Sequence, residues 1–160
     1  MKKEMNNKGF SLVELIIVIA IMAILIVVLA PQYLKYVERS RNSTDLQNAT
    51  ELKTAIETYV ADPESKEAMA DGDTVVLTLS TNAAGTVTGT GKGATLGSAA
   101  LTSAGLTIAD IKCSSKTKWN KYEITGTMQE NGALKWTYKS WVGTTNNTAF
   151  EDAMNGKSST

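Results

Sequence analysis

The chain of 160 residues contains no histidine and only one cysteine, Cys113. Histidine is the commonest general base and zinc ligand, so its absence argues against many hydrolases and zinc sites. A single thiol cannot form a disulfide within the chain. Basic and acidic residues balance at 16 each, which does not favour binding of nucleic acid through bulk charge. We therefore predict a protein that is not an enzyme, has no catalytic residues or specific nucleic-acid site, and uses no metal or cofactor.

The most informative segment is a long apolar run near the N-terminus. Residues 10–30 contain only two polar side chains, Ser11 and Glu14, and the run is unbroken from residue 15. About 20 apolar residues are enough for a helix to cross a bilayer. The run therefore predicts a membrane-spanning helix that carries one carboxylate near its start.

Three interpretations of this run are open. A secretory signal peptide has a shorter apolar stretch and a small-residue cleavage site, whereas PQYLK follows the run here. A plain membrane anchor agrees with Lys2, Lys3 and Lys8, because basic residues before a span favour a cytoplasmic N-terminus. A plain anchor leaves Glu14 without a role. A carboxylate in an apolar span costs about 3 kcal/mol, so such a residue needs an explanation. The third interpretation is a processing and assembly signal.

The segment KGFSLVEL resembles the processing site of type IV prepilins and pseudopilins. The resemblance covers little more than the first third of the chain. It implies that a prepilin peptidase cleaves after Gly9 and that Phe10, the new N-terminal residue, is methylated. Glu14 is then the fifth mature residue, and it would pair with the Phe10 amine of a neighbouring subunit, which offsets the desolvation of both charges. The alternative for Glu14 is a side chain that reaches back to the membrane interface.

Beyond the run, the sequence predicts that the helix continues. Pro31 removes one helical hydrogen bond, and the resemblance implies that residues 23–31 bend or partly melt when subunits pack; a simple kink is the alternative. Apolar residues at three- and four-residue steps from residue 34 to 60 predict an amphipathic helix. It should end near residue 61, because Asp62-Pro63 disfavours helix. The polar segment ERSRNSTD, residues 38–45, is expected to be solvated or to contact other subunits.

The C-terminal part of the chain predicts strands. DTVVLTLS, residues 73–80, alternates between apolar and polar residues, as do KWNKYEITGT and GALKWTYKSW, which predict a hairpin. A three-residue loop at 130–132 would place Ile124 opposite Tyr138 and Gly126 opposite Trp136, whereas a two-residue loop would mix the faces. The apolar face of this hairpin is expected to pack on residues 46–60 of the helix, since a lone hairpin is marginally stable.

Three other segments are less regular. The Gly/Ala/Ser/Thr-rich tract at 81–106 predicts a flexible surface loop or an edge hairpin, and its TGTGKGA lacks the spacing of a phosphate-binding loop. Cys113 is expected to be a small buried residue. The C-terminal TAFEDAMNGKSST predicts a short helix followed by a disordered end.

We therefore predict an α+β chain with the type IV pilin fold, in which a long N-terminal helix packs on a small antiparallel sheet. Its expected parts are a leader at 1–9, a membrane-spanning and filament-core half-helix at 10–31, an amphipathic half-helix at 32–61 and a β-rich head with variable loops at 62–160. The residues expected to act in processing are Gly9 and Phe10, and those in assembly are Phe10, Glu14 and Pro31.

The resemblance implies a structural subunit of type IV pilus filaments that supports adhesion, surface (twitching) motility or biofilm formation. Its partners would be further copies of itself, the prepilin peptidase, an assembly ATPase and a membrane platform. It would be a single-pass protein of the cell membrane before assembly and part of an extracellular pilus afterwards. Gram-negative members of the family usually close a C-terminal loop with a disulfide, which a chain with one cysteine cannot do, so the resemblance points to the Gram-positive, clostridial kind of major pilin. The alternatives are a minor pilin, a type II secretion pseudopilin and, more distantly, a membrane-anchored binding protein.

Overall fold

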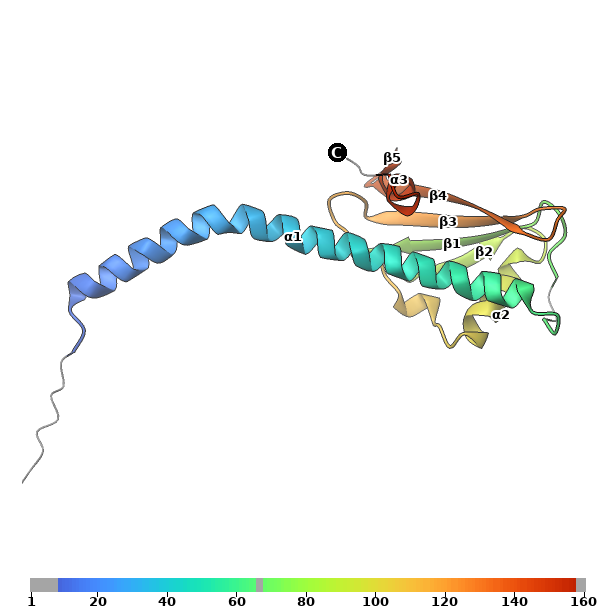
Figure 1. Ribbon diagram of the computed structural model, residues 1–160, viewed down its shortest axis with the longest axis horizontal. Helices are drawn as coiled ribbons and strands as arrows, with labels where there is room; N and C mark the ends of the chain where they lie inside the picture. Colours follow the sequence, from blue (N-terminus) through green and yellow to red (C-terminus); the bar gives the residue numbers. More distant parts are fainter. Residues whose placement is uncertain (1–8, 66–67, 158–160) are drawn as a thin grey trace, which may run out of the picture. The chain divides into compact units, whose positions relative to one another are not determined.

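The computed structural model describes residues 9–65 and 68–157, and it divides into two compact units, Met1–Val37 and Glu38–Thr160. Helix α1 (Leu12–Ala61) contributes residues to both units (Figure 1). The long N-terminal helix and the antiparallel sheet give the α+β pilin fold that the sequence predicts. Apart from Gly9, the expected leader lies outside the described residues.

The first unit consists of the apolar start of α1. Every residue from Gly9 to Tyr36 is exposed in the isolated chain. By length and composition, α1 is the one described helix that could cross a membrane, and none of its most apolar window is buried. The helix begins at Leu12, two residues later than expected, and continues through Pro31. The melting of residues 23–31 during assembly stays a prediction.

The second unit contains a five-stranded antiparallel sheet in the order β2-β1-β3-β4-β5. The strands are β1 (Thr74–Ser80), β2 (Thr86–Gly89), β3 (Lys121–Met128), β4 (Leu134–Val142) and β5 (Thr145–Asn147). The predicted alternation in β1 is confirmed, because Val75, Leu77 and Leu79 are fully buried. Apolar and polar residues therefore face opposite sides of this strand.

The predicted hairpin register between β3 and β4 is also confirmed. Ile124 pairs with Tyr138 and Gly126 with Trp136. The N–H of Gln129 donates to the carbonyl of Ala133, so residues 130–132 form the three-residue loop. Gly132 has a φ of 77° there, a left-handed conformation that glycine adopts without strain.

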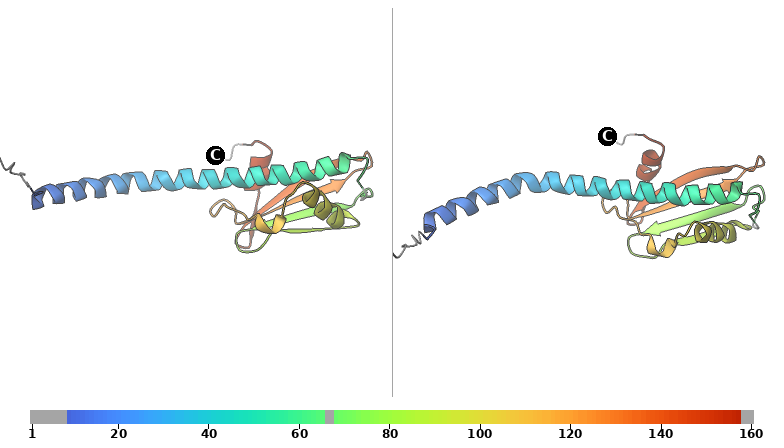
Figure 2. Two further views of the ribbon diagram at one scale, coloured as in Figure 1. Left: turned by 90° about the horizontal axis from the view of Figure 1, so that it is seen from below. Right: turned by 60° about the horizontal axis from the view of Figure 1, so that its bottom comes forward.

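The core of the second unit lies between α1 and the inner face of the sheet. Ala49, Leu52 and Ile56 of α1 are completely buried in one cluster with the inner residues of β1 and β3. Figure 2 shows this part of α1 lying across the sheet, with helix α2 (Gly93–Ser103) beside it. The predicted packing of residues 46–60 on the hairpin is confirmed.

The sequence prediction for residues 81–106 is only partly correct. An edge hairpin is present, since β2 pairs with β1, but α2 replaces the expected surface loop. Glycine weakens an isolated helix, and here its missing side chain permits a close approach to the sheet. A Cβ atom on Gly93 would lie 1.9 Å from the carbonyl oxygen of Thr74, and one on Gly97 would lie 2.6 Å from Val75. Packing on β1 therefore stabilises a helix that local propensity does not predict.

The predicted C-terminal helix is present as α3 (Ala149–Met154). Phe150 is its buried residue and stacks on Tyr122, with ring centroids 4.2 Å apart. The ring of Trp119 meets Phe150 edge-on at 5.2 Å. This aromatic cluster fixes α3 against the end of the sheet where β3 begins.

Candidate functional site

The expected processing site is fully accessible. Gly9 and Phe10 precede the helix, and Phe10 has 91% of its surface exposed. Among the described atoms, none lies within 4 Å of a Cβ built on Gly9. Packing against the described residues therefore does not explain a glycine at this position.

Glu14 has a structural role that the sequence pattern did not predict. Its Oε2 accepts a hydrogen bond of 2.8 Å from the N–H of Ser11, and the Ser11 carbonyl accepts one of 3.2 Å from Leu15. The spacing Ser-x-x-Glu is the signature of a capping box, in which the glutamate satisfies a donor at the helix start. The same carboxylate thus caps α1 in the isolated chain.

The expected site residues do not form one cluster. Gly9, Phe10 and Glu14 lie together at the start of α1. Pro31 follows Glu14 by 17 residues on the same helix, a separation of about 26 Å along its axis. Pro31 therefore lies apart from the expected processing site.

The polar segment at 38–45 contains a buried carboxylate, which contradicts the expectation of a solvated segment. Asp45 is completely buried and accepts four hydrogen bonds. Its Oδ1 accepts from the N–H of Ser114 (2.7 Å), and its Oδ2 accepts from the N–H of Ser115 (2.9 Å), the indole of Trp119 (2.8 Å) and the thiol of Cys113 (3.4 Å). A buried carboxylate is tolerated when such donors replace water.

A positional signal for Asp45 is present in the sequence. Asp45 precedes Ala49, Leu52 and Ile56 at the same helical spacing, so it lies on the buried stripe of α1. Its donors come from residues 113–119, about 70 positions away, and are found only once the chain is folded.

The lone cysteine is inert in this environment. Cys113 is 4% exposed, which confirms the prediction of a buried residue. Burial first, and then the charge of Asp45, raise the pKa of the Cys113 thiol far above its ordinary value. Because the thiolate is the reactive form, the structure offers no support for nucleophilic or redox chemistry at this residue.

Glu38 holds the next part of the same loop, and it lies on the same face of α1 as Asp45, about two turns earlier. Its Oε1 accepts hydrogen bonds from the hydroxyl of Ser115 (2.9 Å) and from the N–H groups of Lys116 (2.7 Å) and Thr117 (2.8 Å). Burial acts to raise the pKa of Glu38, but these hydrogen bonds outweigh it and lower the pKa to about 2. Glu38 and Asp45 together bind residues 113–119 to α1.

The lowered pKa of Glu38 predicts a loss of stability in acid. A carboxyl with a pKa of about 2 in the folded state and 4.5 in the unfolded state stabilises the fold above pH 4.5, and this contribution disappears as the pH falls towards 2. We expect the wild-type unfolding free energy to fall by about 2 kcal/mol more between pH 5 and pH 2 than that of Glu38→Gln. Urea unfolding at each pH measures this difference. Parallel pH curves for the two proteins would contradict the assignment.

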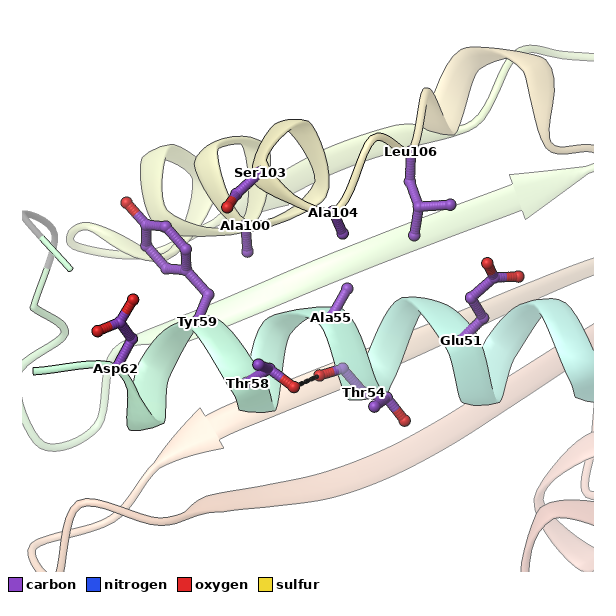
Figure 3. A pocket seen from close by; sticks show the side chains of 10 residues that line it. All are labelled: Glu51, Thr54, Ala55, Thr58, Tyr59, Asp62, Ala100, Ser103, Ala104 and Leu106. Carbon is purple, nitrogen blue, oxygen red and sulfur yellow. Dashed lines mark hydrogen bonds between the residues drawn. The ribbon is translucent and has the colours of Figure 1, made fainter. Parts of the chain in front are cut away.

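An open groove of about 460 Å³ separates α1 from α2 (Figure 3). Glu51 and Asp62 mark its two ends, and alanines and threonines line most of the space between them. The hydroxyl of Thr58 donates to the Thr54 carbonyl of the same helix at 2.8 Å, so it is already engaged. The lining contains no nucleophile paired with a base, and no group of three metal-ligating side chains occurs among the described residues.

Comparison with known proteins matches the N-terminal part of the chain. Residues 5–30 match the family described as "Prokaryotic N-terminal methylation motif". The chain is 42% identical over 89 residues to a type IV major fimbrial protein FimA of Dichelobacter nodosus, covering 49% of this chain and 56% of that protein. No solved structure matches the chain.

Two further relatives align over a similar region. A fimbrial protein of Pseudomonas aeruginosa is 41% identical over 61 residues, 38% of each chain. The type IV major pilin protein PilA of Myxococcus xanthus is 36% identical over 59 residues, 37% of this chain and 27% of that protein. The chain thus matches about half or less of the length of these relatives. The methylation motif, the similarity to type IV major pilins over the N-terminal part, and the long helix with its antiparallel sheet together support the interpretation of the chain as a type IV pilin with a prepilin signal.

Proposed function

We propose that the protein is a structural subunit of a type IV pilus and not an enzyme. The observation that carries this proposal is the first part of α1, where every residue up to Tyr36 is exposed although most are apolar. Such a surface is stable only in lipid or against other helices. A single-pass membrane stage and a helical polymer provide these two environments in succession.

In this proposal, a prepilin peptidase cleaves between Gly9 and Phe10 and Phe10 becomes methylated. Removal of the leader gives Phe10 a free amine, which is largely cationic at neutral pH. Glu14 pairs with this amine on a neighbouring copy, and Pro31 allows α1 to adjust as copies pack. An assembly ATPase and a membrane platform drive the process, and the filament supports adhesion, surface motility or biofilm formation.

Mass spectrometry of material sheared from cells tests the proposal. We expect an abundant chain that begins at a methylated Phe10. A chain that retains Met1 and stays with the membrane fraction would contradict it, and α1 would then be a plain anchor. A processed chain present only in traces would indicate a minor pilin or a pseudopilin instead of the major subunit.

A further inference from the structure

The contacts of Glu38 gather four basic residues at one end of the second unit. Lys116 and Lys118 lie in the loop that Glu38 holds, and both are exposed. Arg39 is the exposed residue that follows Glu38, and Arg41 lies 3.4 Å from the other oxygen of Glu38. We call Arg39, Arg41, Lys116 and Lys118 the basic collar.

The two carboxylates that hold the loop of the basic collar point inward. Asp45 has no exposed surface, and the Glu38 side chain is 13% exposed. Both carboxylates bind the backbone of the loop between residues 114 and 117. The charged side chains that α1 and the loop expose at this junction are therefore cationic, in a chain with a formal net charge of zero, and the acids on α3 at the same end of the sheet are the partly exposed Glu151 and Asp152.

The opposite end of the second unit is acidic. Residue 62 follows the last turn of α1, about 35 Å along the helix from Glu38. The N–H of Gly72 donates to the carbonyl of Met128 at 3.0 Å, which joins the segment after α1 to the far end of β3. The acidic residues at this end are Asp62, Glu64, Asp71, Asp73 and Glu130.

We propose that the basic collar binds the headgroups of anionic phospholipids while the protein is in the membrane. This inference rests on the proposed membrane stage. The apolar run ends at Ala30, and Arg39 follows it by nine residues, at most about 14 Å along a helix. Long basic side chains and a Debye length of about 8 Å bring these charges within range of an anionic surface.

A second copy of the chain is the other source of carboxylates. Two copies in one membrane have their collars at the same number of residues from their apolar runs. The acidic end of a neighbour then lies about 35 Å farther along the helix, so the carboxylates of a neighbour nearest the level of the collar are those of Glu151 and Asp152 on α3. Lipid headgroups surround every copy before assembly, whereas these carboxylates require a second copy, which a disc with one copy excludes.

Lysine acylation in lipid nanodiscs tests the inference. The full chain is placed at one copy per disc, in discs of phosphatidylcholine alone or with 30% phosphatidylglycerol, and labelling rates are read by mass spectrometry. We expect phosphatidylglycerol to slow acylation of Lys116 about threefold or more, and 1 M salt to reverse this, since salt screens surface charge. Lys135, at the acidic end of β4, should label at one rate in both discs.

Two double variants serve as matched controls. Arg39→Gln with Lys118→Gln should abolish the protection of Lys116. Lys135→Gln with Lys139→Gln removes the same number of charges from the outer face of β4 and should leave the protection unchanged.

Each alternative outcome has a distinct meaning. Equal labelling of Lys116 in both discs, in a chain that has entered them, overturns the inference alone. If inorganic phosphate slows acylation of Lys116 equally in phosphatidylcholine discs, the inference is overturned in favour of a general anion site. If Lys116 is protected only when a disc holds two copies, it is overturned in favour of a second copy. A chain that enters neither disc contradicts the proposed function, and the inference falls with it.

Discussion

Replacing Asp45 by alanine is expected to lower the unfolding free energy of the second unit by about 4 kcal/mol. The substitution removes the acceptor for two backbone N–H groups and for the indole of Trp119, all of which are directed at a site with no exposed surface. Each buried donor left without a partner costs about 1–3 kcal/mol. Urea unfolding of the full chain in detergent, followed by tryptophan fluorescence, measures the change.

Two further variants give this prediction its controls. Asp45→Asn keeps one acceptor oxygen but turns an NH₂ group towards the same donors, so we expect an intermediate loss of about 2 kcal/mol. Glu51→Gln changes an exposed carboxylate on the same helix and should shift stability by less than about 0.5 kcal/mol. If the unfolding free energy of Asp45→Ala lies within about 1 kcal/mol of the wild-type value, the carboxylate does not hold the loop as the hydrogen bonds indicate.

The register of the sheet could be predicted where an alternation of apolar and polar residues occurred together with a turn signal. In β3 and β4, the alternation of apolar residues excludes a register shifted by one position, because such a shift would turn Trp136 and Tyr138 towards solvent. Gly132 then provides the left-handed residue that a three-residue loop needs. Both signals are local, so a single sequence was sufficient to define the register.

Helix α2 was not predictable in this way. Its sequence, GATLGSAALTS, contains two glycines and several hydroxyl residues, which weaken helices in isolation. The interaction that stabilises it is the approach of Gly93 and Gly97 to β1, made across the fold. Leu96, Ala100 and Leu101 do recur at helical spacing, and they are the part of the signal that was available.

The residues of the candidate site likewise fall into those that a local pattern predicts and those that only the fold brings together. KGFSLVEL located Gly9, Phe10 and Glu14 because their spacing is a property of the chain itself, and the methylation motif at residues 5–30 covers all three. The hydrogen bonds by which Glu38 and Asp45 hold residues 113–119 depend on donors about 70 positions away. Its acids appeared as ordinary members of a polar segment, although Asp45 shares the spacing of the buried stripe.

Glu14→Gln should separate the capping role of this residue from its proposed role in assembly. Glutamine retains an oxygen that can accept from the Ser11 N–H, so the capping box and the start of α1 persist. It loses the negative charge that would meet the Phe10 amine of a neighbouring copy. An unpaired ammonium in a low-dielectric filament is costly, so we expect at least about a tenfold loss of sheared filament.

Amounts of processed chain in the membrane provide the internal reference for this experiment. They should equal the wild-type level in Glu14→Gln, because the capped helix still spans the membrane and the Gly9-Phe10 bond is unchanged. Glu14→Ala, which removes both the cap and the charge, should assemble no better than Glu14→Gln. If Glu14→Gln forms filaments at the wild-type level and Glu14→Ala does not, capping of α1 explains the glutamate and a charge pair between copies does not.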